Sequence, residues 1–415
     1  MSNSALTHNL EERHHRQRLL FSMMIYAIII CDACIALPKS GITYVFQRLL
    51  QLIIVLCFIF FNLQLLKRDH TLRLDSVQCL IHLWWIVMIV LTVTMAKQIK
   101  LSGIYQWISI CVFLLMIMLY WQENLAEQLH ILALVFAAFV YMNGILYVLY
   151  PDGLWIEYDW QGTGDKTRYL FGNYNQTGIV ILTAVLVNGL DCLLSKRRML
   201  NMYMLMLVGV ATVFAMGSMT STVGLVIVSL YFIFRRFVKH PIPIVNIFIV
   251  LYILFFAVIV WGGKSIDSVP LLRAFVEGGL QKDSTFTSRV GLWLRSIIMI
   301  MDKPILGYGP QDTAWMMAHI GGSGPHNMWL MFMLEGGVFL TSIFALLIIK
   351  LFRFVRKNIT PIGIFSLVCV CVLLLMSLFE TYHIVCVFIL IIVAYYTNNI
   401  TVSTGSQLII DERDN

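Results

Sequence analysis

The chain has 415 residues, of which 60% are hydrophobic and only 12% are charged, and its mean hydropathy is +0.84. Since a soluble domain is only about half apolar, this composition excludes a soluble globular protein and predicts an all-α, polytopic membrane protein. The net charge of +7 does not indicate a nucleic-acid partner, because lysine and arginine are spread over many short segments.

Apolar stretches recur along the whole chain. A membrane helix needs about 20 mostly apolar residues, and by this measure the sequence predicts about twelve helices. We expect one membrane domain over 19–398, with cytoplasmic tails at 1–18 and 399–415. The span cores lie at 19–37, 47–66, 77–95, 104–121, 128–150, 176–194, 200–217, 219–235, 242–261, 327–349, 360–379 and 382–398.

The cysteines and the basic residues fit this layout. All nine cysteines fall in or beside predicted spans, where they pack as small apolar residues, so we expect neither disulfides nor a metal site.

If both termini are cytoplasmic, more than half of the 29 lysines and arginines lie in short cytoplasmic segments, as the positive-inside rule favours. The two longest connections, 151–175 and 262–325, are then outside, and long connections often carry function. We therefore expect an active site on the outer face.

The first long outer loop ends in Arg168-Tyr169-Leu170-Phe171-Gly172-Asn173-Tyr174-Asn175. Its amides can hydrogen-bond sugar hydroxyls, its rings can face sugar rings, and its arginine adds a positive charge. We therefore predict that Arg168 and Asn175 bind substrate. Aromatic residues also form belts at membrane interfaces, and this alternative explains the tyrosines equally well.

The second long loop contains an amphipathic segment at 287–302. Its apolar residues recur at helical spacing, so one stripe is expected to lie on the membrane or on the helix bundle; they are Val290, Trp293, Leu294, Ile297, Ile298 and Met301. The helix should end at Lys303-Pro304. Arg289 and Arg295 lie on this segment, and guanidinium groups bind diphosphates through paired hydrogen bonds. The alternative is that both reach toward lipid headgroups.

The predicted tenth span opens with Pro325-His326-Asn327. We expect Pro325 in the first turn and His326 just inside the helix at the outer surface. The positive end of the helix dipole would then lower the pKa of His326 and favour the neutral imidazole that a general base needs. The alternative is an interfacial histidine that caps the helix.

Other ionisable residues occur in or near the spans. Asp32 and Glu335 are intramembrane acids, which are functional candidates. Glu335 lies about 900° around the helix from His326, so we expect the two to face opposite ways and not to form a dyad. Glu380 and His383 bracket the outer turn before the last span and could reach the same outer cavity. We interpret them as solvated turn residues rather than metal ligands.

Many of these residues fall into one ordered pattern. It contains Ser288, Arg289, Trp293, Pro304, Gly307, Tyr308, Gly309, Pro325, His326, Asn327, Leu330, Glu335, Gly336 and Gly337. In order and spacing this run resembles the signature region of the O-antigen ligase/polymerase family, which contains an arginine, a tryptophan, P-x-x-G-x-G, and H-N at the start of a helix. The resemblance is close over 288–337 and looser over the layout of spans.

The resemblance implies an inverting membrane glycosyltransferase of the bacterial inner membrane that uses glycans on undecaprenyl diphosphate and needs no metal or other cofactor. It implies that Arg289 binds the donor diphosphate, that His326 deprotonates or orients the acceptor hydroxyl, and that Asn327 holds the sugar or the histidine. We also expect Trp293, Arg295 and Tyr308 to bind substrate. The expected partners are the lipid-linked oligosaccharide, membrane lipid, a flippase and a chain-length regulator.

One departure from the family pattern bears on the reaction. Ligases of the family carry a second arginine in a T-x-S-R-G-like stretch, and this chain has Ser221 at that point of 217–224. Either Arg168 supplies the second cation or the site has fewer charges. The departure favours a polymerase of repeat units over a ligase that transfers finished glycan to lipid A–core or another acceptor.

Two other classes of function fit parts of the sequence. A transporter would share the number of spans, but carriers show a repeat between their halves and charged residues near the midplane, and here the halves differ. A non-catalytic assembly partner in an envelope complex would need neither His326 nor Arg289.

Overall fold

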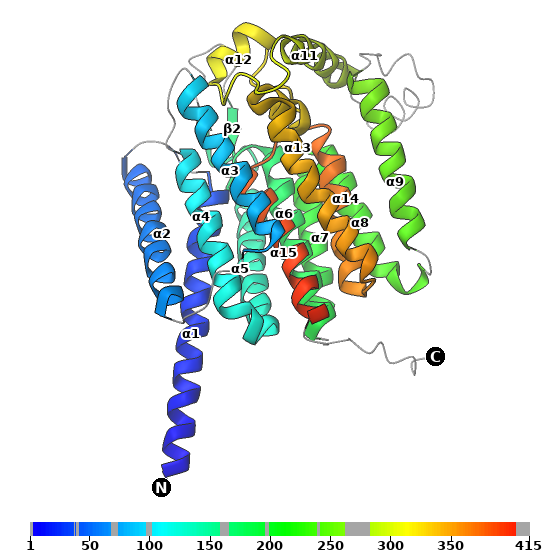
Figure 1. Ribbon diagram of the computed structural model, residues 1–415. Helices are drawn as coiled ribbons and strands as arrows, with labels where there is room; N and C mark the ends of the chain where they lie inside the picture. The colour runs from blue at the N-terminus through cyan, green and yellow to red at the C-terminus, as the bar shows by residue number, and fades with distance from the viewer. Residues whose placement is uncertain are drawn as a thin grey trace.

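The computed structural model describes residues 3–36, 38, 41–67, 74–96, 102–157, 166–195, 199–238, 241–261 and 283–403. Within these residues the chain is a bundle of helices with one small hairpin, so the predicted all-α class is confirmed (Figure 1). Eight of the helical stretches are long and apolar enough to cross a membrane, and three shorter helices are also apolar. The chain is therefore a multi-pass membrane protein.

The elements follow one another in this order: α1 (Asn3–Cys34), α2 (Gly41–Lys67), α3 (Ser76–Met95), α4 (Ser102–Met116) continued by the π-helical turn Ile117–Trp121, α5 (Gln122–Leu149), β1 (Trp155–Glu157), β2 (Lys166–Arg168), α6 (Tyr174–Ser195), α7 (Met199–Ala215), α8 (Met219–Phe234), a 3₁₀ turn (Arg235–Phe237), α9 (Pro241–Phe255) continued by the π-helical turn Phe256–Trp261, α11 (Asp283–Asp302), α12 (Thr313–Ile320), α13 (Met328–Lys357), α14 (Pro361–Ser377) and α15 (Ile384–Ser403). Strands β1 and β2 pair antiparallel, with Trp155 opposite Arg168.

Each predicted span core coincides with one of these helices. Two of the cores, 104–121 and 128–150, lie within one continuous helical stretch, Ser102–Leu149, in which Asn124 is non-helical (φ −140°, ψ 47°). The number of membrane crossings therefore stays a prediction. The predicted loop segments 68–73, 158–165, 196–198 and 262–282 and the tail 404–415 lie outside the described residues.

Helices α6 and α15 form the centre of the bundle. In each, 83% of the most apolar stretch is buried by neighbouring helices. Close packing here depends on Gly178 of α6, because a Cβ at this position would lie 2.0 Å from the Ser221 hydroxyl oxygen of α8. Helix α8 can thus approach α6 closely, which sets the position of the turn between α7 and α8.

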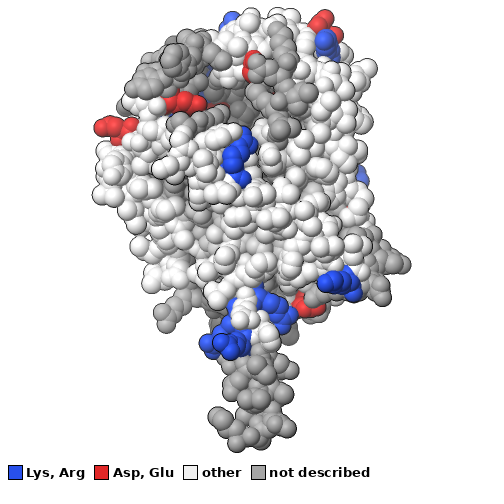
Figure 2. Space-filling model, turned by 90° about the vertical axis from the view of Figure 1, so that its left-hand side faces the viewer, with Lys and Arg blue, Asp and Glu red and all other residues white. Residues whose placement is uncertain are grey.

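The two ends of the bundle differ. The start of α1 and the end of α15 lie at the lower end in Figure 1, whereas the hairpin, α11 and α12 lie at the upper end. On the face shown in Figure 2, most lysines and arginines gather toward the lower end, a broad middle band carries few charges, and a hollow opens near the upper end. This distribution agrees with the predicted orientation, which places the upper end outside, but the orientation itself stays a prediction.

The predicted amphipathic segment is confirmed as helix α11, which ends at Asp302 as the following Lys303-Pro304 predicts. Its apolar stripe is divided, however. Trp293 and Ile297 are buried against Leu330 and Leu334 of α13, whereas Ile298 is 67% exposed. The helix thus packs on the bundle along one edge and leaves a second apolar edge uncovered by protein.

A break in α13 holds the loop that follows α11. Gly337 has φ 61° and ψ −161°, so the backbone around it cannot make regular helical hydrogen bonds. The loop takes their place: Tyr308 N donates to Leu334 O (2.7 Å), Gly309 N donates to Glu335 O (2.9 Å), and Val338 N donates to Pro304 O (2.8 Å). The pairing explains why proline and glycines at 304–309 and the Gly336-Gly337 pair occur in the same sequence pattern.

Candidate functional site

A histidine and a carboxylate meet at the upper end of the bundle. His326 Nδ1 lies 2.9 Å from Glu380 Oε1, although 54 residues separate the two in sequence. Glu380 is only 4% exposed, whereas the His326 side chain is 33% exposed. A buried carboxylate at Nδ1 favours a proton on that nitrogen, which leaves Nε2 with its lone pair.

An arginine from α11 approaches the same carboxylate. The guanidinium of Arg289 lies 3.8 Å from Glu380 Oε2, and its side chain is 16% exposed. The distance is at the outer limit of an ion pair, so the guanidinium keeps N–H donors for a further anion. Arg289, His326 and Glu380 therefore form one constellation, which we call the His–Glu–Arg site.

A neutral hydrogen-bond network supports Glu380 from the centre of the bundle. Asn175, in the first turn of α6, donates from Nδ2 to Glu380 Oε2 (2.5 Å). Its Oδ1 lies 3.2 Å from the hydroxyl of Ser218, which lies 2.9 Å from the Ser221 hydroxyl. Tyr382 hydrogen-bonds to Ser221, and burial, with the nearby Glu380 charge, raises the pKa of its phenol. Buried polar groups are thus paired around a buried charge.

Two side chains position the segments that carry His326 and Glu380. Trp293, fully buried on α11, donates from Nε1 to Pro325 O (3.0 Å) and packs against Phe379. Asn327 is the N-cap of α13, since its Oδ1 accepts the N–H groups of Trp329 and Leu330, while its Nδ2 donates to Leu378 O (3.0 Å). Both contacts tie the His326 segment to the turn that contains Glu380.

The predicted place of His326 in the helix is wrong. Helix α13 begins at Met328, so Pro325 and His326 precede its N-cap. Asn327 is the stronger capping residue, because its side-chain oxygen reaches the first free N–H groups. The backbone of His326 has φ 47°. Among the described residues that are not glycine, it alone has a positive φ. Such strained backbone is typical of functional sites.

The interpretation of Glu380 as a solvated turn residue is also wrong, because it is buried and paired with His326. The spacing to His383 drew attention to this turn, but it gave no reason to connect it with His326. His383 itself faces the other way, with Nε2 3.4 Å from Phe171 O, and burial lowers its pKa. In the described part of the chain, no three potential metal ligands converge.

Three of the predicted substrate-binding residues have other partners. Arg168 pairs with Glu157 across the β1–β2 hairpin. Arg295 donates to Gly291 O within α11 (3.3 Å). The Tyr308 hydroxyl donates to Asp302 Oδ2 (2.7 Å), and burial with this contact raises the pKa of Tyr308 to about 12. Of the predicted set, the structure thus brings together Arg289, His326, Asn327, Asn175 and Trp293.

Fold and site together define a multi-pass membrane protein with a histidine, a carboxylate and an arginine at one end of its bundle. Residues 203–345, about a third of the chain, match the family model described as O-antigen ligase. This match confirms the resemblance to the O-antigen ligase/polymerase family, whose members are membrane glycosyltransferase-like enzymes. It includes Arg289 and His326, whereas Glu380 and Asn175 lie outside it. No curated protein matches the chain.

Proposed function

We propose that this protein polymerises undecaprenyl-diphosphate-linked oligosaccharide repeat units into a surface polysaccharide, such as O-antigen, capsule or exopolysaccharide. The reaction is an inverting glycosyl transfer at the outer face of the bacterial inner membrane. The observation that carries the proposal is the His–Glu–Arg site, since it combines a base with a cation at one end of a membrane bundle. A flippase that delivers the units and a chain-length regulator are the expected protein partners.

His326 supplies the base of this mechanism. Glu380 accepts the Nδ1–H and fixes the ring, so that Nε2 can take the proton of an acceptor hydroxyl. The hydroxyl oxygen attacks the anomeric carbon of the donor from the side opposite the diphosphate. The new C–O bond forms as the old one breaks, the diphosphate leaves with the bonding electrons, and the configuration inverts.

Arg289 stabilises the negative charge of the departing diphosphate. In the transition state the negative charge on the bridging oxygen grows, and a fixed guanidinium in a partly buried site lowers its energy more than it would in water. The side chain is largely enclosed, and its present partner, Glu380, is shared with His326. Donor binding would thus place the diphosphate and the base on either side of one carboxylate.

The neutral network behind Glu380 supports a polymerase over a ligase. Ser221 stands where ligases of the family carry a second arginine, and it is fully buried against Gly178. A guanidinium has no room there. Arg168 pairs with Glu157 and therefore does not replace it. Among the described residues the site thus has one arginine, Arg289, and this departure from the ligase pattern favours the polymerase.

The test is polymerisation by the purified protein in bilayers that contain undecaprenyl-diphosphate-linked repeat units and EDTA. We expect a ladder of products on a gel, which is lost in His326→Ala and in Arg289→Ala. Matched controls are His319→Ala on α12 and Arg353→Ala at the opposite end of α13, which should keep the ladder. Transfer to added lipid A–core without a ladder would favour the ligase, and neither product would favour a transporter.

A further inference from the structure

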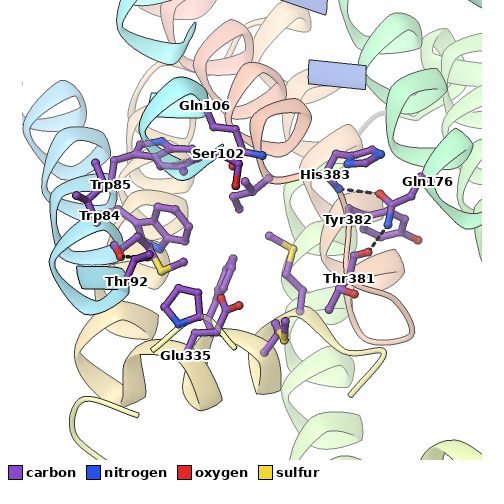
Figure 3. Close-up of a pocket in the computed structure, with 18 residues that line it drawn as sticks. Trp84, Trp85, Thr92, Ser102, Gln106, Gln176, Glu335, Thr381, Tyr382 and His383 are labelled. Atoms are coloured by element: carbon purple, nitrogen blue, oxygen red, sulfur yellow. Dashed lines mark hydrogen bonds between the residues drawn. The ribbon is translucent and has the colours of Figure 1, made fainter. Parts of the chain in front are cut away.

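A cavity of about 380 Å³ opens beside the His–Glu–Arg site. Its walls come from α3 between Trp84 and Thr92, the start of α4, Gln176 of α6, α13 and the turn before α15, as Figure 3 shows. Trp84 and Trp85 lie on one side, Glu335 lies below, and Thr381, Tyr382 and His383 lie opposite. The cavity is thus lined by groups that the mechanism above does not use.

The lining combines aromatic surface with hydroxyl and amide groups. Trp84 and Trp85 form an edge-to-face pair, with ring centroids 5.2 Å apart. Around them lie Thr92, Ser102 and Gln106, together with Gln176 and Thr381. Apolar rings that cover C–H faces, with polar groups that exchange hydrogen bonds with hydroxyls, are what a sugar ring requires.

The two tryptophans contribute apolar surface and not hydrogen bonds. Their indole N–H groups are buried and make no hydrogen bond within the described part of the chain, and the two side chains are only 1% and 2% exposed. The hydroxyl and amide groups of the lining are therefore the ones that can hydrogen-bond a ligand in the cavity.

The charges of the lining residues indicate which class of ligand the cavity can bind. Among the described lining residues none is a lysine or an arginine, and Glu335 adds an acid. The described lining thus offers no cation to a diphosphate, whereas its hydroxyl and amide groups can hydrogen-bond sugar hydroxyls. It therefore fits an uncharged saccharide better than the lipid diphosphate.

The cavity lies next to the residues that flank the reacting groups. Its wall includes Thr381, next to Glu380, and Met328, which follows Asn327 at the start of α13. The backbone N–H of Thr381 donates to Glu380 Oε1, the oxygen that faces His326, whereas Arg289 approaches Oε2. A residue of the cavity wall and the cation thus contact different oxygens of the same carboxylate.

From these observations we infer that the cavity is the acceptor subsite, and that it binds a sugar residue of the acceptor glycan against Trp84 and Trp85. The inference rests on the proposed function, because it assumes a donor diphosphate at Arg289. The sugar enters from the side of α3 and α4, and its hydroxyl is presented to His326.

Gly103 offers a way to fill the cavity without altering the His–Glu–Arg site. It lines the cavity, and a Cβ added there would meet no atom within 4 Å, so a larger side chain can be placed. We expect Gly103→Phe to weaken saccharide binding at least tenfold. Gln106→Ala removes one amide, adds no bulk and should weaken saccharide binding less. This variant replaces Gly103→Phe in the test if Gly103→Phe does not fold. The control Val90→Phe adds the same ring on an exposed face of α3.

The measurement is calorimetric titration of the purified protein in nanodiscs with the free repeat-unit oligosaccharide, released by mild acid from the lipid-linked intermediate of the same cells. This probe has no diphosphate and cannot react, so binding is separate from turnover. In polymerisation assays, Gly103→Phe should raise the acceptor KM with little change in kcat.

The outcomes separate the two proposals. Binding that is lost in Gly103→Phe and kept in Val90→Phe supports the subsite, even if no ladder forms and the polymerase proposal fails. A ladder from a wild-type protein that binds no free oligosaccharide overturns the subsite and leaves the polymerase. Equal binding by wild type, Gly103→Phe and Gln106→Ala also overturns the subsite.

Discussion

At the scale of single residues, Glu380 connects every other group of the His–Glu–Arg site. One of its oxygens faces His326 Nδ1 and the N–H of Thr381, and the other faces Asn175 and Arg289. A carboxylate can serve all of these donors because it accepts only, whereas an amide would present a donor to one of them.

Glu380→Gln keeps the shape of the side chain and removes its charge. We expect kcat to fall by about 10²- to 10³-fold, because Nδ1 loses the acceptor that fixes the ring of the base. The thermal unfolding temperature should fall moderately, because the amide nitrogen of the glutamine faces another donor in a buried site. Initial rates of chain elongation, measured beside a melting curve in detergent, check both expectations; a variant with more than a tenth of the wild-type kcat would contradict this role.

The sequence predicted the base, the cation and Asn175 of this site, but not Glu380. His326 and Arg289 lie in a local pattern, so their spacing alone identified them. Glu380 follows His326 by 54 residues, with two helices, α13 and α14, between them. The contact between Glu380 and His326 depends on how α13 and α14 pack against each other, and no periodicity in a single sequence encodes this packing. An acid beside the end of a span was the available signal.

At the scale of elements, the break in α13 and the loop 304–309 depend on each other. The broken helix exposes backbone groups that the loop pairs, and Gly337 makes the break possible. Hydrophobic periodicity predicted both helices flanking the loop, but it could not predict the break, because the apolar pattern continues through it. The same limit applies to the start of α13, where Asn327 and not Pro325 sets the boundary.

Gly337→Ala should destabilise the protein strongly. Its φ of 61° disfavours any side chain, and a Cβ would lie 2.2 Å from Ile305 O, which is backbone and cannot move aside alone. We expect a loss of at least about 2 kcal/mol, seen as a lower unfolding temperature in detergent. Gly291→Ala is the control, since its Cβ would meet only Arg295, at 3.7 Å. Equal melting of both variants would show that the break is not required.

At the scale of the whole molecule, the bundle separates a basic end from an end that carries the site. The start of α1, the end of α15 and most of the visible basic residues lie at the lower end, and α11, α12 and the hairpin lie at the upper end (Figures 1 and 2). Composition alone predicted the class of fold, because the burial of apolar stretches this long requires a membrane. The packing order of the helices was not predictable, since any of them could pair with any other.

This polarity predicts the topology. Green fluorescent protein fused after residue 403 should fluoresce, because it folds in the cytoplasm, whereas alkaline phosphatase inserted at Asp152, in the exposed turn before β1, should be active only outside. The reverse pattern would place the His–Glu–Arg site in the cytoplasm and would exclude transfer at the outer face.

A double-mutant cycle shows whether His326 and Glu380 act as one unit in glycosyl transfer. Elongation rates are measured for wild type, His326→Ala, Glu380→Gln and the double variant in the same bilayers. If Glu380 acts through His326, the double variant is no slower than His326→Ala alone, because residues that act as a unit are not additive. Losses that multiply in the double variant would show that His326 and Glu380 have independent roles.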